Sequence, residues 1–178
     1  MTSPVEFSRM VRLDEIGRMR FPAHIEANEA ERAALAERFK FVTLDRLEAE
    51  YDLARDGSVI QASGTISASL SQPCIATGEP VPETVKEAFS IRFVPEEPRA
   101  GQDPEEEIEL DTDDCDILPY DGARLDIGEA VAETLALHVE PYPRSANADA
   151  YLRELGVLTE EQAGPFAALA ALREKAGK

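Results

Sequence analysis

The chain has 178 residues, of which 43% are hydrophobic, and carries a formal net charge of −18. This length favours a single domain over residues 1–178 with a real hydrophobic core, and so negative a chain is poorly suited to sequence-independent binding along nucleic acid. No apolar run is long enough to span a bilayer, and the first 20 residues carry Glu6, Asp14 and Glu15 but no signal-like apolar segment. We therefore expect a soluble, cytoplasmic protein.

The first predicted elements are a strand over residues 4–13 and a helix over residues 29–39, joined by a connection. Asn28 followed by Glu31 is typical of a capping box at the start of a helix. The helix itself is rich in Ala and has a weak apolar stripe that includes Leu35.

A β-hairpin and a third strand come next, because the apolar period changes to two. Apolar residues alternate with charged ones from Leu47 to Leu53 and alternate again from Gly64 to Leu70, while Asp56-Gly57 supplies the turn. Residues 84–93 then read as a strand with one apolar face. The segment around Cys74 is therefore predicted to connect two neighbouring strands.

That connection reads QPCIATGEPV and resembles half of a zinc knuckle in which Thr77 stands at the second cysteine position. A structural zinc site needs about four thiolate or imidazole ligands. The chain offers Cys74, Cys115, His24 and His138, which lack metal-ligand spacing. We expect two free thiols, no bound metal and no cofactor. Cys74 as a catalytic nucleophile is the weaker alternative, because no histidine signature accompanies it.

Residues 96–116 form a strongly acidic segment with 11 acids and one base. Its low hydrophobicity, with Pro and Gly, predicts a flexible loop. The candidate partner-binding residues in it are Glu105, Glu106, Glu107, Glu109, Asp111, Asp113 and Asp114. A solvated loop that contributes only solubility is the alternative.

The C-terminal third is predicted to be mainly helical. A short strand and a turn precede a helix over residues 127–138, which Asp126 and Glu129 cap. Residues Ile127, Val131, Leu135 and His138 form its packed face, with His138 read as a core or helix-end residue. Two prolines then begin a loop, followed by helices over residues 151–155 and 165–175. The predicted fold class is α+β, with a mostly antiparallel sheet and flanking helices. The sequence does not decide whether the sheet closes into a barrel.

Basic residues gather toward the two ends of the chain. The candidate RNA-contact residues are Arg9, Arg12, Arg18, Arg20, Arg173, Lys175 and Lys178. The alternative is that they balance nearby acids, since the stacking aromatics of single-strand readers are missing from these segments.

The order of these pieces resembles the YceD-like family over roughly residues 40–175. The segments that carry the resemblance are CIATGEPV, EAFSIRFVPE, LDIGEAVAETLALHVEPYPR and GPFAALAALREK. The family-motif residues are Cys74, Thr77, Gly78, Glu79, Pro80, Asp126, Glu133, Pro141 and Pro143. Many members show CxxC where this chain has Cys74 and Thr77, and some carry further cysteines where this chain has Arg144–Asn147. This departure favours a metal-free loop.

The resemblance implies a bacterial or organellar, non-enzymatic ribosome-biogenesis factor that promotes synthesis, processing or stability of large-subunit ribosomal RNA. The implied partner is ribosomal RNA or a basic ribosome-associated protein. A protein adaptor or chaperone without RNA contact is one alternative, and a Cys74-dependent enzyme is another. The sequence leaves the oligomeric state open.

Overall fold

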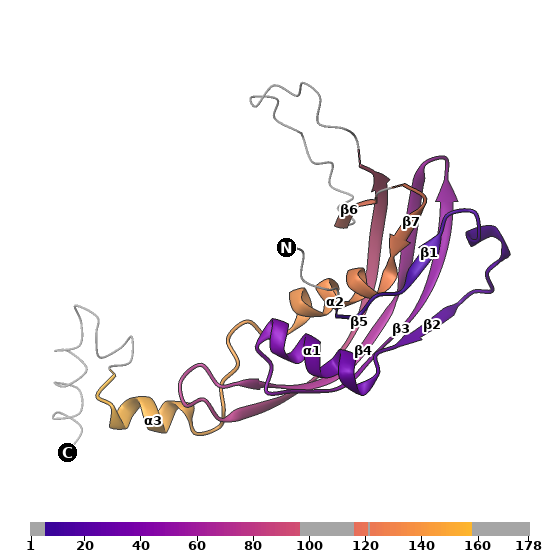
Figure 1. Cartoon of the computed structure of the whole chain (residues 1–178). Helices are drawn as coiled ribbons and strands as arrows, with labels where there is room; N and C mark the ends of the chain where they lie inside the picture. Colours follow the sequence, from indigo (N-terminus) through magenta and orange to yellow (C-terminus); the bar gives the residue numbers. More distant parts are fainter. Residues whose placement is uncertain (1–5, 97–115, 121, 158–178) are drawn as a thin grey trace, which may run out of the picture. The chain divides into compact units, whose positions relative to one another are not determined.

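The computed structural model describes residues 6–96, 116–120 and 122–157 (Figure 1). The chain divides into two compact units: Met1–Gln72 with Pro82–Glu140, and Pro73–Val81 with Pro141–Lys178. This division does not decide the single-domain prediction, which stays a prediction. In the described part of the chain, no helix is long and apolar enough to cross a membrane.

The first unit is built on a five-stranded sheet in the order β2-β3-β4-β5-β6. Its strands are β2 (Ala23–Glu26), β3 (Thr43–Asp56), β4 (Val59–Pro73), β5 (Pro80–Pro95) and β6 (Asp116–Tyr120). Within the described residues the sheet is open, with β2 and β6 as its edges, so it does not close into a barrel. The α+β prediction is confirmed. The parallel pairing of β6 with β5 was not predicted.

The predicted hairpin is confirmed as β3 and β4, which pair in register from Leu47↔Ala68 to Asp56↔Val59. Gly57 makes the turn with a positive φ of 60°. Gly64 permits a close approach of the two strands, because a Cβ there would collide with the Glu50 carbonyl and lie 2.9 Å from the Phe89 ring. The apolar positions of both strands are buried, as the alternation predicted.

Two helices of the first unit match their predicted ranges, α1 (Glu29–Phe39) and α2 (Ile127–His138). Asn28 and Glu31 form the predicted capping box, and Asp126 caps α2 through the Glu129 amide. Leu35 of α1 and the Ile127 face of α2 join the sheet residues in one buried core. Of the two interpretations of His138, the helix-end one is confirmed and the core one is wrong: His138 is exposed and is the last residue of α2.

The N-terminal segment differs from its prediction. The strand expected over residues 4–13 is only β1 (Met10–Arg12), which pairs antiparallel with β7 (Arg124–Asp126). Ser8 and Arg9 instead make side-chain contacts with α1 and α2. The predicted connection after it contains the 3₁₀ helix η1 (Ile16–Arg18) and the edge strand β2. Ile25 alone supplies a buried apolar residue to β2, so its period was too weak to detect.

The described part of the second unit contains the Cys74 loop, the loop that begins at Pro141 and a short helix, α3 (Ala148–Glu154). The helix predicted over residues 151–155 therefore begins three residues earlier and ends at Glu154. The helix predicted over residues 165–175 lies outside the described residues, as does most of the predicted acidic loop. Glu96 is exposed after β5, and Asp116 already belongs to β6.

Candidate functional site

The Cys74 loop is a tight turn that joins β4 to β5. The Gly78 amide donates to the Cys74 carbonyl at 2.9 Å, and the Cys74 amide donates to the Glu79 carbonyl at 2.7 Å. Gly78 adopts a positive φ of 74°, which L side chains rarely tolerate. Gly78 therefore has a backbone reason to occupy its position in the turn.

The loop after Pro141 packs onto this turn within the second unit. The Ile75 amide donates to the Pro143 carbonyl at 3.0 Å, and the Ser145 amide donates to the Cys74 sulfur at 3.3 Å. The Thr77 and Ser145 hydroxyls lie 3.3 Å apart. Sequence reasoning missed Ser145 as a partner of Cys74. No local signal marks this partner, because the two residues lie 71 positions apart.

The side chains around Cys74 do not fit a structural zinc ion. Neutral hydroxyls at Thr77 and Ser145 take the places where thiolates would be needed. Across the described ranges, no group of three or more His, Cys, Asp and Glu side chains is placed to hold a metal ion. Cys115 lies outside those ranges, and His24 is exposed on β2. The expectation of a metal-free protein stays a prediction.

Cys74 nevertheless has an unusual electrostatic setting. Its residue is 3% exposed, and burial acts to raise the pKa of the thiol. Hydrogen bonds from Ser145 and Thr77 outweigh burial and bring the Cys74 pKa to about 6. Hydrogen bonds from Ser145 and Asn147 likewise lower the pKa of Glu79. A nucleophile would need an activating base and an open approach, and the thiol is enclosed.

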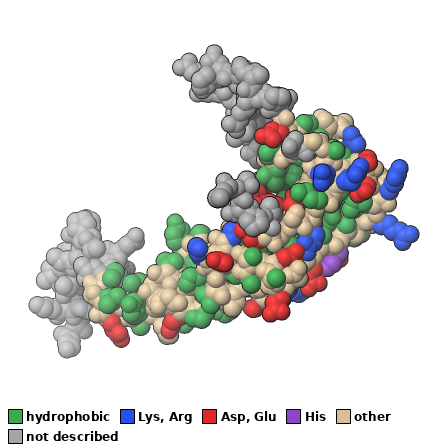
Figure 2. All heavy atoms as spheres, viewed as in Figure 1, with side chains coloured by type: hydrophobic (Ala, Val, Ile, Leu, Met, Phe, Trp, Pro, Cys, Tyr) green, Lys and Arg blue, Asp and Glu red, His purple; other side chains and the backbone are tan. Residues whose placement is uncertain are grey.

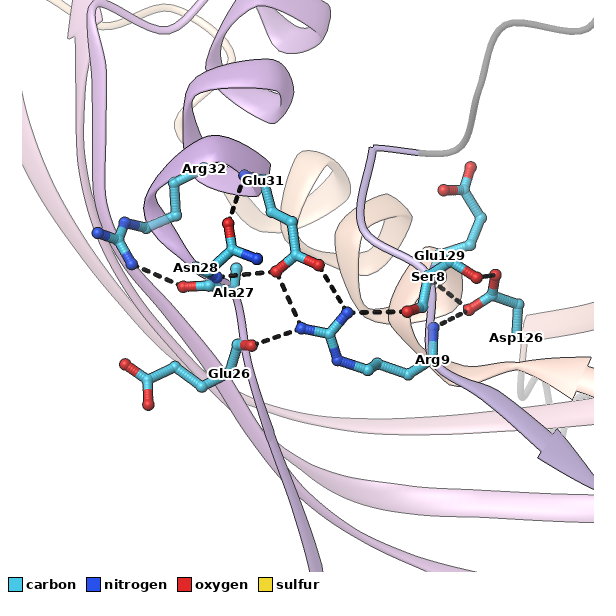
Figure 3. A network of polar contacts seen from close by, with 9 residues as sticks. All are labelled: Ser8, Arg9, Glu26, Ala27, Asn28, Glu31, Arg32, Asp126 and Glu129. Atoms are coloured by element: carbon cyan, nitrogen blue, oxygen red, sulfur yellow. Dashed lines mark hydrogen bonds and ion pairs between the residues drawn. The ribbon is translucent and has the colours of Figure 1, made fainter.

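A second polar cluster ties the N-terminal segment to both helices of the first unit. The Arg9 guanidinium donates to both Glu31 carboxylate oxygens, at 2.7 and 2.9 Å, and to the Ser8 and Glu26 carbonyls (Figure 3). The Arg9 amide and the Ser8 hydroxyl donate to Asp126. Glu31 and Asp126 are also the helix-capping residues. Arg9 is therefore occupied by contacts within the protein.

The other candidate RNA-contact residues are paired with acids, exposed, or outside the described residues. Arg12 pairs with Asp14 at 2.9 Å and lies near Glu15. Arg18 and Arg20 are exposed, and Figure 2 shows Lys and Arg side chains gathered over β1 and η1. Arg124 faces Arg12 across the β1–β7 pair and was not predicted. Arg173, Lys175 and Lys178 lie outside the described residues, so the patch formed by both chain ends stays a prediction.

Arg38 holds a cluster of carboxylates between α1 and α2. Its guanidinium donates to both oxygens of Glu129, at 2.8 and 3.0 Å, and to Glu6 at 3.0 Å. Glu133 lies at 4.0 Å, the outer limit for an ion pair. Burial and the charge of Glu129 raise the pKa of Glu133, against the opposite effect of Arg38. Sequence reasoning identified Glu133 but not Arg38, which is 91 positions from Glu129.

A pocket of about 540 Å³ opens beside this cluster in the first unit. It lies between β5 and β6, the β1–β7 pair and α2. Its lining residues are Met10, Phe93, Leu118, Pro119, Tyr120, Arg124, Leu125, Asp126, Glu129, Ala130 and Glu133. Asp126 and Glu133, which the family resemblance singled out, therefore share one pocket wall.

Comparison with protein families matches residues 62–173 to the family described as "Large ribosomal RNA subunit accumulation protein YceD". The match covers more than half of the chain, and the chain belongs to this family. It begins in β4, later than the residue 40 suggested by the resemblance. Searches of curated proteins and of solved structures found no significant match. Membership implies a role in large-subunit ribosomal RNA accumulation, and the family is not a known enzyme family.

Proposed function

We propose that this protein is a non-enzymatic ribosome-biogenesis factor that promotes the synthesis, processing or stability of large-subunit ribosomal RNA by binding a basic ribosome-associated protein. The family description supports the link to the RNA. The observation that carries the choice of partner is the charge: 36 acids against 18 bases give −18. A basic protein is attracted to such a surface, whereas RNA phosphates are repelled.

The arrangement of the ion pairs strengthens this choice. Five arginines in the described ranges are held by carboxylates of the same chain. These are Arg9, Arg12, Arg38, Arg46 and Arg144. Within the described ranges these arginines are therefore already paired inside the protein, while the whole sequence has 36 acids for 18 bases. The acidic residues 105–114 add a second attractive surface, in which Ile108 and Leu110 can contact the partner.

Pull-downs with purified chain test this proposal. The wild type is expected to recover basic ribosomal proteins at low salt and to lose them as the salt concentration rises. Salt screens the attraction between exposed charges, and at physiological ionic strength this attraction fades beyond a distance of about 8 Å. In the variant, the seven acids from Glu105 to Asp114 become Asn or Gln. Equal recovery by the two proteins would show that this segment takes no part in binding.

Direct RNA contact is the second candidate, favoured by the exposed Arg18 and by the exposed Arg124, which faces Arg12 across the β1–β7 pair. Such a patch would contact phosphates and so fix position without reading sequence. Charge reversal at Arg18 and Arg124 is expected to abolish crosslinking to RNA if this candidate is right. Unchanged crosslinking would exclude the patch.

A further inference from the structure

The pocket beside β6 has an apolar floor and a wall of carboxylates. Phe93, Leu125 and Ala130 reach it from the buried core, and Leu118 is half-buried on β6. Among the described lining residues there are three carboxylates and one cation, Arg124. The volume of about 540 Å³ falls within the range of ligand pockets and exceeds what one side chain fills.

The three carboxylates that line the pocket differ in how many hydrogen-bond donors and cations of the same chain they contact. Asp126 accepts from Ser8, from the Arg9 amide and from the Glu129 amide. Glu129 accepts through both oxygens from Arg38. Among the described residues, Glu133 has as its cation only the Arg38 guanidinium at 4.0 Å, which Glu6 also shares. One cation thus serves three carboxylates, and Glu133 is the one with capacity for another.

We propose that this pocket seats a Lys- or Arg-containing segment of a basic protein. The aliphatic part of the basic side chain lies on Phe93, Leu118 and Leu125, and its charged head reaches Glu133. Long basic side chains often combine an apolar stem with a charged tip in this way. The inference rests on the proposed function, because it names the place where the basic partner is held.

Charge decides among the occupants. The acidic residues 103–114 of this chain would meet like charges at the wall, and RNA phosphates would meet the same repulsion. A free hydrophobic peptide would fill the floor but leave Glu133 unmatched. A segment with both apolar and basic side chains satisfies both parts of the lining.

Binding of a labelled synthetic peptide to the full-length chain tests the inference. The probe is a short peptide of lysine–leucine–serine repeats, followed by fluorescence anisotropy at low salt. We expect the probe to shift the methyl NMR signals of Met10, Leu118 and Leu125. Glu133→Gln should weaken binding about two- to fivefold, the range of a part-exposed ion pair.

Glu87→Gln is the matched control, since Glu87 is exposed on β5 and does not line the pocket. It makes the same change in net charge and should leave the affinity unchanged. Equal weakening by both variants, or methyl signals that do not move, would overturn the inference. A short RNA that moves the same methyl signals would also overturn it, because RNA would then be the occupant.

The two proposals fail in different ways. If the peptide binds at the pocket but loss of the protein leaves large subunits normal in cells, the proposed function is wrong and the pocket assignment stands. If large subunits fall but Glu133→Gln matches Glu87→Gln, the pocket assignment is wrong and the proposed function stands.

Discussion

Arg9 and Glu31 form a two-point ion pair that joins the segment before β1 to the first turn of α1, with N–O distances of 2.7 and 2.9 Å. Glu31 simultaneously accepts from the Asn28 amide and completes the capping box. The same arginine also serves two backbone carbonyls. Arg9, which the sequence presents as a free cation, therefore connects two segments of the fold through non-covalent contacts.

Removal of the Arg9 side chain should therefore destabilise the protein. We expect Arg9→Ala to lower the free energy of unfolding by about 1–3 kcal/mol, because it leaves a part-buried Glu31 and two carbonyls without their donor. Arg12→Ala is the control, since Arg12 pairs with Asp14 in full exposure to solvent and its loss should change stability much less. Urea unfolding measures both. Equal shifts in midpoint would contradict the cross-linking role.

The same pair gives a pH dependence whose sign follows from Glu31. The hydrogen bond from Arg9 holds the pKa of Glu31 below its ordinary value of 4.5, against the opposing effect of burial. A lowered carboxyl pKa contributes stability that is complete above the unfolded pKa and lost as pH falls through the folded one. The stability gap between wild type and Glu31→Gln should therefore be constant from pH 7 to about pH 5 and shrink below that. A gap that widens in acid would contradict this assignment.

From the hydrogen bonds that hold the Cys74 loop, we predict that folding of the protein does not depend on a metal ion. Purified wild type should contain no stoichiometric zinc, and a chelator should leave its thermal transition unchanged, because Thr77 and Ser145 already close the loop by hydrogen bonds. One zinc per chain by elemental analysis would contradict this.

An engineered variant serves as the positive control for that experiment. Thr77→Cys, Ser145→Cys and Ala148→Cys would add three thiolates to Cys74 on the two facing loops. We expect this triple variant to bind Co²⁺ with the visible spectrum of a tetrahedral thiolate site and to gain thermal stability with Zn²⁺. The single variant Ser145→Cys offers only two thiolates and should not.

Gly64 tests the close packing of the sheet. Gly64→Ala should destabilise the protein by about 2–4 kcal/mol, since its Cβ would meet the Glu50 carbonyl and the Phe89 ring in a dense core. Gly17→Ala is the control, because a Cβ there meets nothing within 4 Å and the position has no positive φ. Thermal unfolding of both variants, compared with wild type, would decide whether the strands can separate to admit a methyl group.

Local signals in the sequence predicted most of the described fold. Asn28 with Glu31, Asp56-Gly57 and Asp126 with Glu129 each act within a few residues, and each marks an element boundary that the structure confirms. Long-range pairings could not be predicted in this way. The strands β5 and β6 pair in parallel although residues 97–115 separate them in the sequence, and the residue pattern of a strand does not show the direction of its neighbour.

The site was less accessible to sequence reasoning than the fold. Thr77 was predicted to hold the turn without a metal, and this stays a prediction. Its partner Ser145 lies 68 positions away. Arg9 was named as a candidate RNA contact, with pairing to an acid as the alternative, and the acid that it pairs with, Glu31, lies 22 positions further along. The contacts of a polar side chain depend on residues that are distant in the sequence. The periodic pattern of apolar residues indicates only which side of a helix or strand is buried.

The most direct test of the central claim is the large-subunit content of cells without this protein, measured by sedimentation of ribosomes. The account predicts a loss of large subunits that wild-type protein and Cys74→Ala both restore, because no chemistry at Cys74 is required. Neutralising the seven acids from Glu105 to Asp114 together with Glu133→Gln should restore them less well. A normal level of large subunits without the protein would contradict the claim, and failure of Cys74→Ala alone, at normal protein abundance, would contradict its non-enzymatic part.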